Sequence, residues 1–382
     1  MIFPCIEIGS LPKLPGRQAK VQNREPSVQD KEILEYLCLR YPVLSSSLLT
    51  YYDARQIQEI TKANSSFYIA LQEAIGLDYV FDGEAHRKEM YQSVVEHVRG
   101  MQKLDQQVSF VNKEGYPNIF TPFSFVHPLV LEKPLHTEET CYILSQATKA
   151  VKVPITGAYT LGTWSDLGSF PAEMMKQGRR HSEARRVVME QLVLEFADKV
   201  INPSLKALAS LGVARIQIDE PNASAFYGQE ELLYEATRRS VAGVESVGGS
   251  SSNRIELGMH ICFSRDYSAI AGIGKIPEMK FLTLEIANRD AGDHQVYRDV
   301  LEAFEREGYK GKYCIGVQDV HTDVLEPAEL ITERLLYAAD IVDVNRIEAA
   351  PDCGLRSRKL PLAVKKLERL MEGVRIARKK RS

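Results

Sequence analysis

Short apolar runs rich in β-branched residues alternate along the chain with longer segments of helical spacing. Each apolar run ends in a cluster of polar or chemically reactive side chains. Near-continuous apolar runs separated by helices are typical of parallel strands buried on both faces. The pattern predicts eight such strands, at residues 5–10, 77–84, 151–157, 214–220, 255–263, 280–287, 313–321 and 340–354.

Helices are predicted between these strands. Residues 184–212 are apolar at helical spacing and end on Gly212, and residues 327–340 begin with Pro327, where the missing N–H costs nothing. Eight strand–helix units with polar strand ends are the signature of an α/β fold, the (β/α)8 TIM barrel, whose active site lies at the C-terminal ends of the strands. We therefore expect one domain over residues 1–382, with an inserted hairpin near residues 106–127.

Composition and charge exclude several classes of protein. With 382 residues, 44% hydrophobic and 26% charged, the chain has the make-up of a globular protein with a large core. A net charge of −3 gives no reason to expect nucleic acid or a membrane surface as a partner. No run approaches the roughly 20 apolar residues that span a bilayer. Six scattered cysteines and an N-terminus that resembles a buried strand, not a signal peptide, predict a reducing, cytoplasmic location.

Candidate metal ligands stand at the ends of three predicted strands. His260 and Cys262 are two residues apart, so on a strand both side chains project from the same face. With Glu285 and Cys353 they form a set of one imidazole, two thiolates and one carboxylate, which suits tetrahedral zinc. The alternative is a core histidine beside buried cysteines. Zinc with two thiolate ligands favours activation of a substrate thiol over hydrolysis.

Carboxylates and a glycine-containing segment form a second group. Glu84 and Asp219 end predicted strands, and two carboxylates at one face suit the ammonium group of an amino-acid substrate. The backbone of Ile8, Gly9 and Ser10 is a candidate for the other end of that substrate, because glycine lets a ligand approach the main chain. Surface ion pairs are the alternative interpretation of each carboxylate.

Two further residues have candidate roles. His321 ends a strand, and a neutral imidazole steered by a neighbouring carboxylate is a candidate proton carrier. Trp164 is the only tryptophan; it is either an aromatic wall for a flat donor or a core residue.

The motifs taken together resemble the C-terminal catalytic domain of cobalamin-independent methionine synthase. In order along the chain, from Ile8 to about Arg358, they are EIGS, GLDYVFDGEAHRKEM, ITGAYTLGTWS, IQIDEP, GMHICFS, LTLEIA, QDVHT and PDCGLRSR. The resemblance implies zinc ligands and homocysteine contacts at the positions already singled out. It also implies that His321 donates a proton and that Trp164 lies against a folate donor. The implied activity is transfer of a methyl group to homocysteine, giving methionine.

Two departures from the family pattern bear on the methyl donor. The chain lacks the additional N-terminal barrel of the long enzymes, and Ala225 stands where the family has a pterin-contacting glutamate. A pterin needs matched hydrogen-bond partners, so this loss weakens the case for methyltetrahydrofolate. The chain looks like the short single-barrel relatives. The donor is therefore expected to be methylcobalamin or another methylcorrinoid, free or on a corrinoid protein, or else methyltetrahydrofolate.

Two alternative functions stay open. The chain also resembles epoxyalkane:coenzyme M transferases, which are zinc-dependent alkyltransferases for another thiol. Glu84 and Asp219 favour homocysteine over such a sulfonated thiol. The second alternative is a non-catalytic paralogue that binds zinc or a partner protein, and the complete ligand set argues against it.

Overall fold

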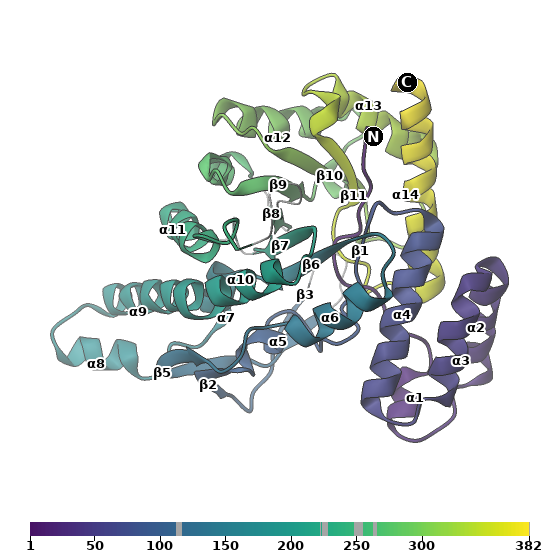
Figure 1. The fold of residues 1–382 in the computed structure, drawn as a ribbon. Coiled ribbons are helices and arrows are strands. Elements are labelled where there is room, and N and C mark those ends of the chain that lie inside the picture. Colours follow the sequence, from purple (N-terminus) through teal and green to yellow (C-terminus); the bar gives the residue numbers. More distant parts are fainter. Residues whose placement is uncertain (112–116, 222, 224–227, 248–254, 263–265, 382) are drawn as a thin grey trace.

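The computed structural model describes residues 1–111, 117–221, 223, 228–247, 255–262 and 266–381. Its centre is a curled sheet of seven parallel strands in the order β1-β6-β7-β8-β9-β10-β11 (Figure 1). The strands are β1 Tyr79–Val80, β6 Ala150–Thr156, β7 Arg215–Asp219, β8 Glu256–Ile261, β9 Met279–Leu284, β10 Lys312–Gln318 and β11 Ile347–Pro351.

Register aligns the C-terminal ends of the central strands. Thr156 on β6 pairs with Asp219 on β7, and Asp219 pairs with His260 on β8. His260 in turn pairs with Thr283 on β9. Side chains at the ends of these strands therefore lie at one level of the sheet, which is the position expected for a site in an α/β fold of this kind.

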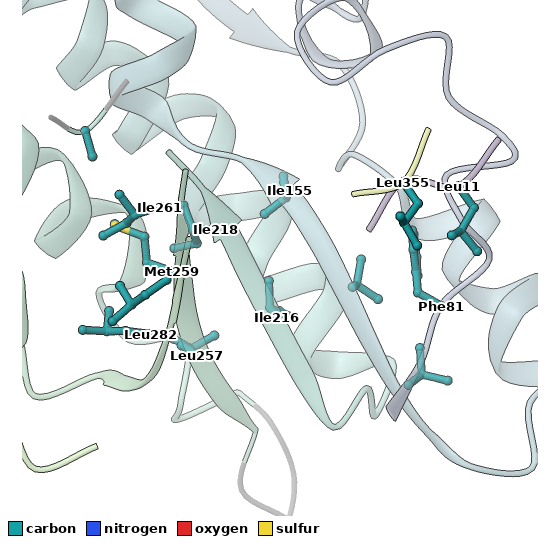
Figure 2. Close-up of a cluster of buried hydrophobic side chains, with 14 of the residues drawn as sticks. Leu11, Phe81, Ile155, Ile216, Ile218, Leu257, Met259, Ile261, Leu282 and Leu355 are labelled. Atoms are coloured by element: carbon teal, nitrogen blue, oxygen red, sulfur yellow. The ribbon is translucent and has the colours of Figure 1, made fainter. Parts of the chain in front are cut away.

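Alternation along the strands separates two faces of the sheet. On β7, Arg215 reaches Glu348 on β11 and Gln217 reaches the Ile8 carbonyl, although neither partner is on a neighbouring strand. Such contacts are possible only across the concave side of the curl. Ile216 and the other apolar residues between these positions point to the opposite face, because strand side chains alternate. Figure 2 shows this apolar layer, formed by Ile155, Ile216, Ile218, Leu257, Met259, Ile261 and Leu282.

Helices surround the sheet (Figure 1). Those that follow the strands are α6 Thr137–Gln146, α7 Ala158–Trp164, α8 Phe170–Lys176, α9 His181–Phe196, α10 Asn202–Ser210, α11 Glu230–Val241, α12 Gln295–Arg306, α13 Ala328–Ala339 and α14 Leu360–Arg381. Before β1, α1 Arg17–Val21, α2 Val28–Arg40 and α3 Ser45–Asp53 form a lobe beside α4 Ile57–Ile75. In the described residues, no helix is both long enough and apolar enough to cross a membrane.

The segment before the sheet forms no regular strand, so the sheet has seven strands instead of the predicted eight. Cys5 makes an isolated parallel bridge to Ala349, and the Asp78 N–H donates to the Cys5 carbonyl at 2.9 Å. At Ile8 the carbonyl accepts hydrogen bonds from the side chains of Lys152 and Gln217, not from a neighbouring backbone. These side-chain bonds replace the ladder beyond the first residues of the segment.

Two other predicted strands are shorter than expected. The strand predicted at residues 77–84 is reduced to β1. The Gln72 side chain bonds to both the N–H and the carbonyl of Phe81, and Gly83 and Glu84 then turn the chain with positive φ angles of 67° and 58°. The strand predicted at residues 340–354 is reduced to β11, preceded by a 3-10 turn at Val344–Arg346.

Four short strands lie between α5 Gln92–Val95 and α6. Strand β2 Val98–Lys103 pairs antiparallel with β5 Phe123–Leu131. Strand β3 Val108–Val111 pairs antiparallel with β4 Pro117–Phe120. The hairpin predicted near residues 106–127 overlaps β3, β4 and the start of β5, and residues 112–116 of it lie outside the described residues.

Candidate active site and metal centre

Three of the four predicted metal ligands converge. The ligand atoms of His260, Cys262 and Cys353 all lie within 4.8 Å of one another. His260 lies on β8 and Cys262 directly follows that strand, so their spacing turns both side chains to the concave side. Cys353 comes two residues after β11, three strands away in the sheet, and the curl brings its thiol to the other two.

The chemistry of this cluster fits a zinc ion. His260 and Cys262 are buried, and both ring nitrogens of His260 lack a hydrogen-bond partner among the described residues. A buried imidazole without partners costs free energy that coordination would offset. The contact with Cys262 holds the pKa of the Cys353 thiol well below its usual range, and the nearby His260 acts in the same direction. Cys353 is thus ready to serve as a thiolate, the form that binds metal.

Glu285, the fourth predicted ligand, is not part of the cluster in which the ligand atoms of His260, Cys262 and Cys353 lie within 4.8 Å of one another. It follows β9, and its Oε1 accepts a hydrogen bond from the Asn288 amide and lies 3.4 Å from His321 Nε2. Burial lowers the pKa of His321, but the contacts with Glu285 and Cys353 outweigh it and raise the pKa to about 9. The contacts with Glu285 and Cys353 therefore favour the protonated form of the imidazole. Asp319 Oδ1 accepts a hydrogen bond from the His321 backbone N–H at 2.8 Å.

Asp352 is a residue of the site that the sequence did not single out. Its carboxylate accepts hydrogen bonds from the backbone N–H groups of Ile286, Ala287 and Asn288 at 2.7–2.9 Å. These bonds tie the end of β11 to the end of β9. They fix the loop after Glu285 relative to Cys353, the residue next to Asp352. The proximity of Asp352 to Cys353 in sequence was the available signal.

The two predicted carboxylates lie on the same side of the sheet. Asp219 is level with His260 in the sheet, and burial raises the pKa of its carboxyl to about 6. Glu84 is buried in the turn after β1, and its carboxylate lies 3.8 Å from Arg87 and 3.6 Å from Arg356. Buried acids of this kind bind cations strongly, because a cation offsets the cost of desolvating the charge.

The Ile8–Ser10 segment lies against Glu84 and against the chain after Cys353. A Cβ on Gly9 would be 3.6 Å from Glu84 Oε1, and Leu355 N–H donates to Ser10 O at 2.8 Å. The Gly9 N–H is already bonded to a carboxylate, and the Ile8 carbonyl is bonded to two side chains. Among the described residues, the Ser10 N–H and hydroxyl form no such bond, so Ser10 is the part of the segment available to a ligand.

Apolar packing holds these segments together. Leu11, Phe81 and Leu355 are buried and lie side by side (Figure 2). Leu11 follows Ser10, Phe81 lies three residues before Glu84, and Leu355 lies two residues after Cys353. The Leu11 N–H also donates to Gly83 O at 3.1 Å. The three side chains therefore anchor the parts of the chain that carry Ser10, Glu84 and Cys353.

Trp164 lies at the end of α7. Its ring stacks on Phe120 with centroids 5.0 Å apart and lies 6.1 Å from Tyr91. The first turn of α7 is fixed by Glu220, which accepts from the backbone N–H groups of Tyr159 and Thr160. The helix begins two residues after β6 and ends at Trp164. Ala225, which stands where the family has a pterin-contacting glutamate, lies outside the described residues.

Comparisons with known proteins agree on one family. The catalytic-domain model of the cobalamin-independent synthases matches residues 44–376. A methionine synthase of Thermoplasma acidophilum is 31% identical over 323 residues, covering 78% of this chain and 84% of that protein. A 5-methyltetrahydropteroyltriglutamate–homocysteine methyltransferase of Vibrio cholerae is 27% identical over 76% of this chain but only 35% of its own length.

A solved structure gives the same result for the fold. A B12-independent methionine synthase from Shewanella sp. W3-18-1 has a TM-score of 0.72 and 19% identity, and the match covers 100% of this chain and 99% of that chain. The family match spans most of the chain, and the motifs quoted above lie mainly within it. The family predicted from those motifs is confirmed: the chain belongs to the cobalamin-independent methionine synthases, a family of S-methyltransferases.

Proposed function

We propose that this protein transfers a methyl group to the thiol of homocysteine, forming methionine, with zinc held by His260, Cys262 and Cys353. The observation that carries the proposal is the convergence of these three ligands within 4.8 Å, in a chain of this family. Asp219, level with His260, and Glu84 supply the carboxylates that an amino-acid substrate requires. Glu285 is the proposed fourth ligand.

The metal would supply one chemical effect. Zinc bound by thiolates lowers the pKa of an incoming thiol, which makes a thiolate nucleophile available near neutral pH. The protein's own residues supply orientation. His260 and Cys262 are fixed by β8 and Cys353 by the Asp352 contacts, so the ligand set needs little rearrangement.

The acidic side of the site determines the proposed acceptor. Asp219 and Glu84 bind the ammonium group of homocysteine, and Ser10 takes its carboxylate through its N–H and hydroxyl. A thiol with a sulfonate and no ammonium group would bring a negative charge to these two buried carboxylates. That repulsion disfavours a coenzyme M-type acceptor.

Methyltetrahydrofolate is the proposed donor. The family is cobalamin-independent, and the Vibrio cholerae relative is named for a methyltetrahydropteroyl donor. In this transfer the carbon–nitrogen bond of the donor breaks, a sulfur–carbon bond forms, and the departing nitrogen takes up a proton. His321, whose protonated form is favoured by Glu285 and Cys353, is the proposed source of that proton. Trp164 and Phe120 form the proposed wall for the pterin ring.

We also propose a cytoplasmic location and a closed (β/α)8 barrel. The structure has all six cysteines free, and the thiols of Cys262 and Cys353 must stay reduced to bind a metal, which favours a cytoplasmic location. The bridge from Cys5 to Ala349 and the bond from Asp78 to the Cys5 carbonyl support a (β/α)8 barrel closed by the N-terminal segment.

The test is methionine formation by the zinc-loaded protein from homocysteine, with methyltetrahydrofolate as its mono- and triglutamate and with methylcobalamin in parallel reactions. We expect methionine from a folate donor and none from methylcobalamin. Turnover with methylcobalamin alone would overturn the proposed donor. Absence of methionine, together with alkylation of coenzyme M by an epoxide, would overturn the proposed acceptor.

A further inference from the structure

A buried polar network lies on the concave face beneath the proposed substrate site. Lys152 on β6 and Gln217 on β7 are almost completely buried, with exposed fractions of 1% and 0%. Lys152 Nζ donates to the Ile8 carbonyl and, at 2.9 Å, to Gln217 Oε1. Gln217 Nε2 donates to the Ile8 carbonyl at 2.9 Å and to Asp219 Oδ1 at 2.8 Å.

The chemistry of the groups fixes the direction of every bond in this network. A lysine ammonium can only donate, so the Gln217 atom that faces it is the carbonyl oxygen. Both hydrogens of the Gln217 amide are then directed at Ile8 O and Asp219 Oδ1, which can only accept. The Gln217 side chain is satisfied in one orientation and cannot flip without burying unpaired groups.

The two acceptors belong to different parts of the substrate site. Ile8 begins the segment that carries Ser10, the proposed contact of the substrate carboxylate. Asp219 is the proposed contact of the ammonium group. The two residues are far apart in sequence, and the segment around Ile8 has no regular ladder to hold it in register with β7. Gln217 is the side chain that bonds to both.

We propose that Gln217, oriented by Lys152, is a positioning residue that sets the distance between the two halves of the amino-acid site and so confers selectivity for an α-amino acid thiol. This proposal rests on the function proposed above. It assigns no contact with substrate to Gln217 or Lys152. Both act through Ile8 and Asp219, and their loss is expected to affect recognition of the amino acid but not of the methyl donor.

The test is the variant Gln217→Glu, which keeps the shape and the Lys152 contact but turns a carboxylate oxygen toward Ile8 O and Asp219 Oδ1. Three oxygens without a shared hydrogen repel each other, so the two acceptors move apart. We expect the KM for homocysteine to rise about tenfold or more, with the KM for the methyl donor within about twofold of the wild type. Bound zinc is expected to stay at the wild-type level.

Gln318→Glu is the matched control. Gln318 is also buried at the end of a strand of the sheet, and its amide donates to the Lys366 carbonyl at 3.0 Å, away from Ile8 and Asp219. We expect Gln318→Glu to lose about as much thermal stability as Gln217→Glu, but to change the KM for homocysteine no more than the KM for the methyl donor. If the Gln217 variant does not fold, Lys152→Gln provides the second test, because it keeps a donor but removes the ammonium that orients Gln217. A smaller rise in the same KM is expected.

A further readout separates positioning from a merely structural role. The ratio of kcat/KM for homocysteine to that for 4-mercaptobutanoate, which lacks the amino group, should fall in Gln217→Glu by the same factor as the homocysteine KM rises. The proposal would be overturned if Gln217→Glu changed the KM for homocysteine and the KM for the methyl donor equally. It would also be overturned if Gln318→Glu raised the KM for homocysteine alone. Failure of the wild type to form methionine would instead overturn the proposed function, so the two failures are distinguishable.

Discussion

Two polar clusters lie on the concave face of the same sheet, one at each end of its strands. The amino-end cluster consists of Arg215, Glu256, Lys312, Cys314 and Glu348, and the carboxyl-end cluster consists of Asp219, His260, Cys262 and Cys353. The amino-end cluster is internally satisfied. Its central residue, Arg215, is paired with both glutamates and lies over the ring of Tyr79 at 3.9 Å.

The carboxyl-end cluster has the opposite character. His260 has two buried ring nitrogens without hydrogen-bond partners in the described part of the chain, and burial raises the pKa of Asp219 to about 6. A cluster that satisfies itself stabilises the fold, whereas one with groups left over is prepared for a ligand. The difference follows the general division of α/β barrels, in which the C-terminal ends of the strands carry the chemistry.

The largest expected contrast comes from one cysteine in each cluster. Cys353→Ser should abolish zinc binding and lower methionine formation about a thousandfold or more, because a bound metal is worth several kcal/mol of transition-state stabilisation. Cys314→Ser is the matched control, since Cys314 donates to Glu348 at 2.9 Å and serine can make the same bond. It should keep zinc and activity. Metal analysis after gel filtration and the methionine assay measure both effects, and equal activities of the two variants would contradict the contrast.

Arg215→Met should have the reverse effect. It removes the closest charged partner of Glu348, which is 1% exposed, and leaves the Cys314 thiol and Lys312, 3.7 Å away, so we expect the free energy of unfolding to fall by up to about 3–5 kcal/mol. The kinetic constants of the folded, zinc-loaded protein should stay close to wild type. Chemical denaturation measures the loss. Lys312→Met is the comparison, because Lys312 is partly exposed and should cost less than about 1 kcal/mol.

Asp219→Asn should weaken the proposed substrate site without emptying the proposed metal site. A hydrogen bond to a charged group contributes about 1.5–3 kcal/mol, so the KM for homocysteine should rise about 10- to 100-fold. Zinc content should not change, because Asp219 is not among the converging ligands. Steady-state kinetics at saturating donor measures this effect. A variant that lost zinc together with substrate affinity would show that the two functions of the cluster are not separable.

Glu7 provides a smaller, pH-dependent test. Burial raises the pKa of Glu7 from 4.5 to about 7, and Lys152 partly opposes the shift. Between these pH values the folded protein binds more protons than the unfolded chain, so stability falls as pH rises. Glu7→Gln removes this dependence. Relative to the variant, the wild type should lose about 2–3 kcal/mol between pH 4.5 and 7, measured by denaturation at each pH. Parallel pH curves for the two proteins would contradict this.

The convergence of the candidate residues at the carboxyl ends of the strands could be predicted from sequence, because these residues follow apolar runs directly. His260 and Cys262 stand two residues apart on one strand, and the end of a strand marks the level at which Asp219 and His260 meet. Local spacing is sufficient for such inferences. The family could likewise be predicted, because several motifs occur in one order.

The parts that were missed depend on contacts across the sheet. Gln217 and Lys152 lie inside strands that look like ordinary core, and only the curl brings them to Ile8. Those side-chain bonds also explain why the first predicted strand has no regular ladder. Asp352 reaches the loop after β9 from the end of β11, and Glu285 is turned toward His321. Pairings between residues distant in sequence leave no periodic signal in a single chain.

The most direct test of the carboxyl-end cluster is a zinc titration of chelator-treated protein, with the initial rate of methionine formation recorded at each addition. The metal-free protein should be inactive. The rate should rise linearly and stop rising at one equivalent of zinc, because His260, Cys262 and Cys353 form one site. A full rate without zinc would contradict the account, as would a rate that does not respond to the metal.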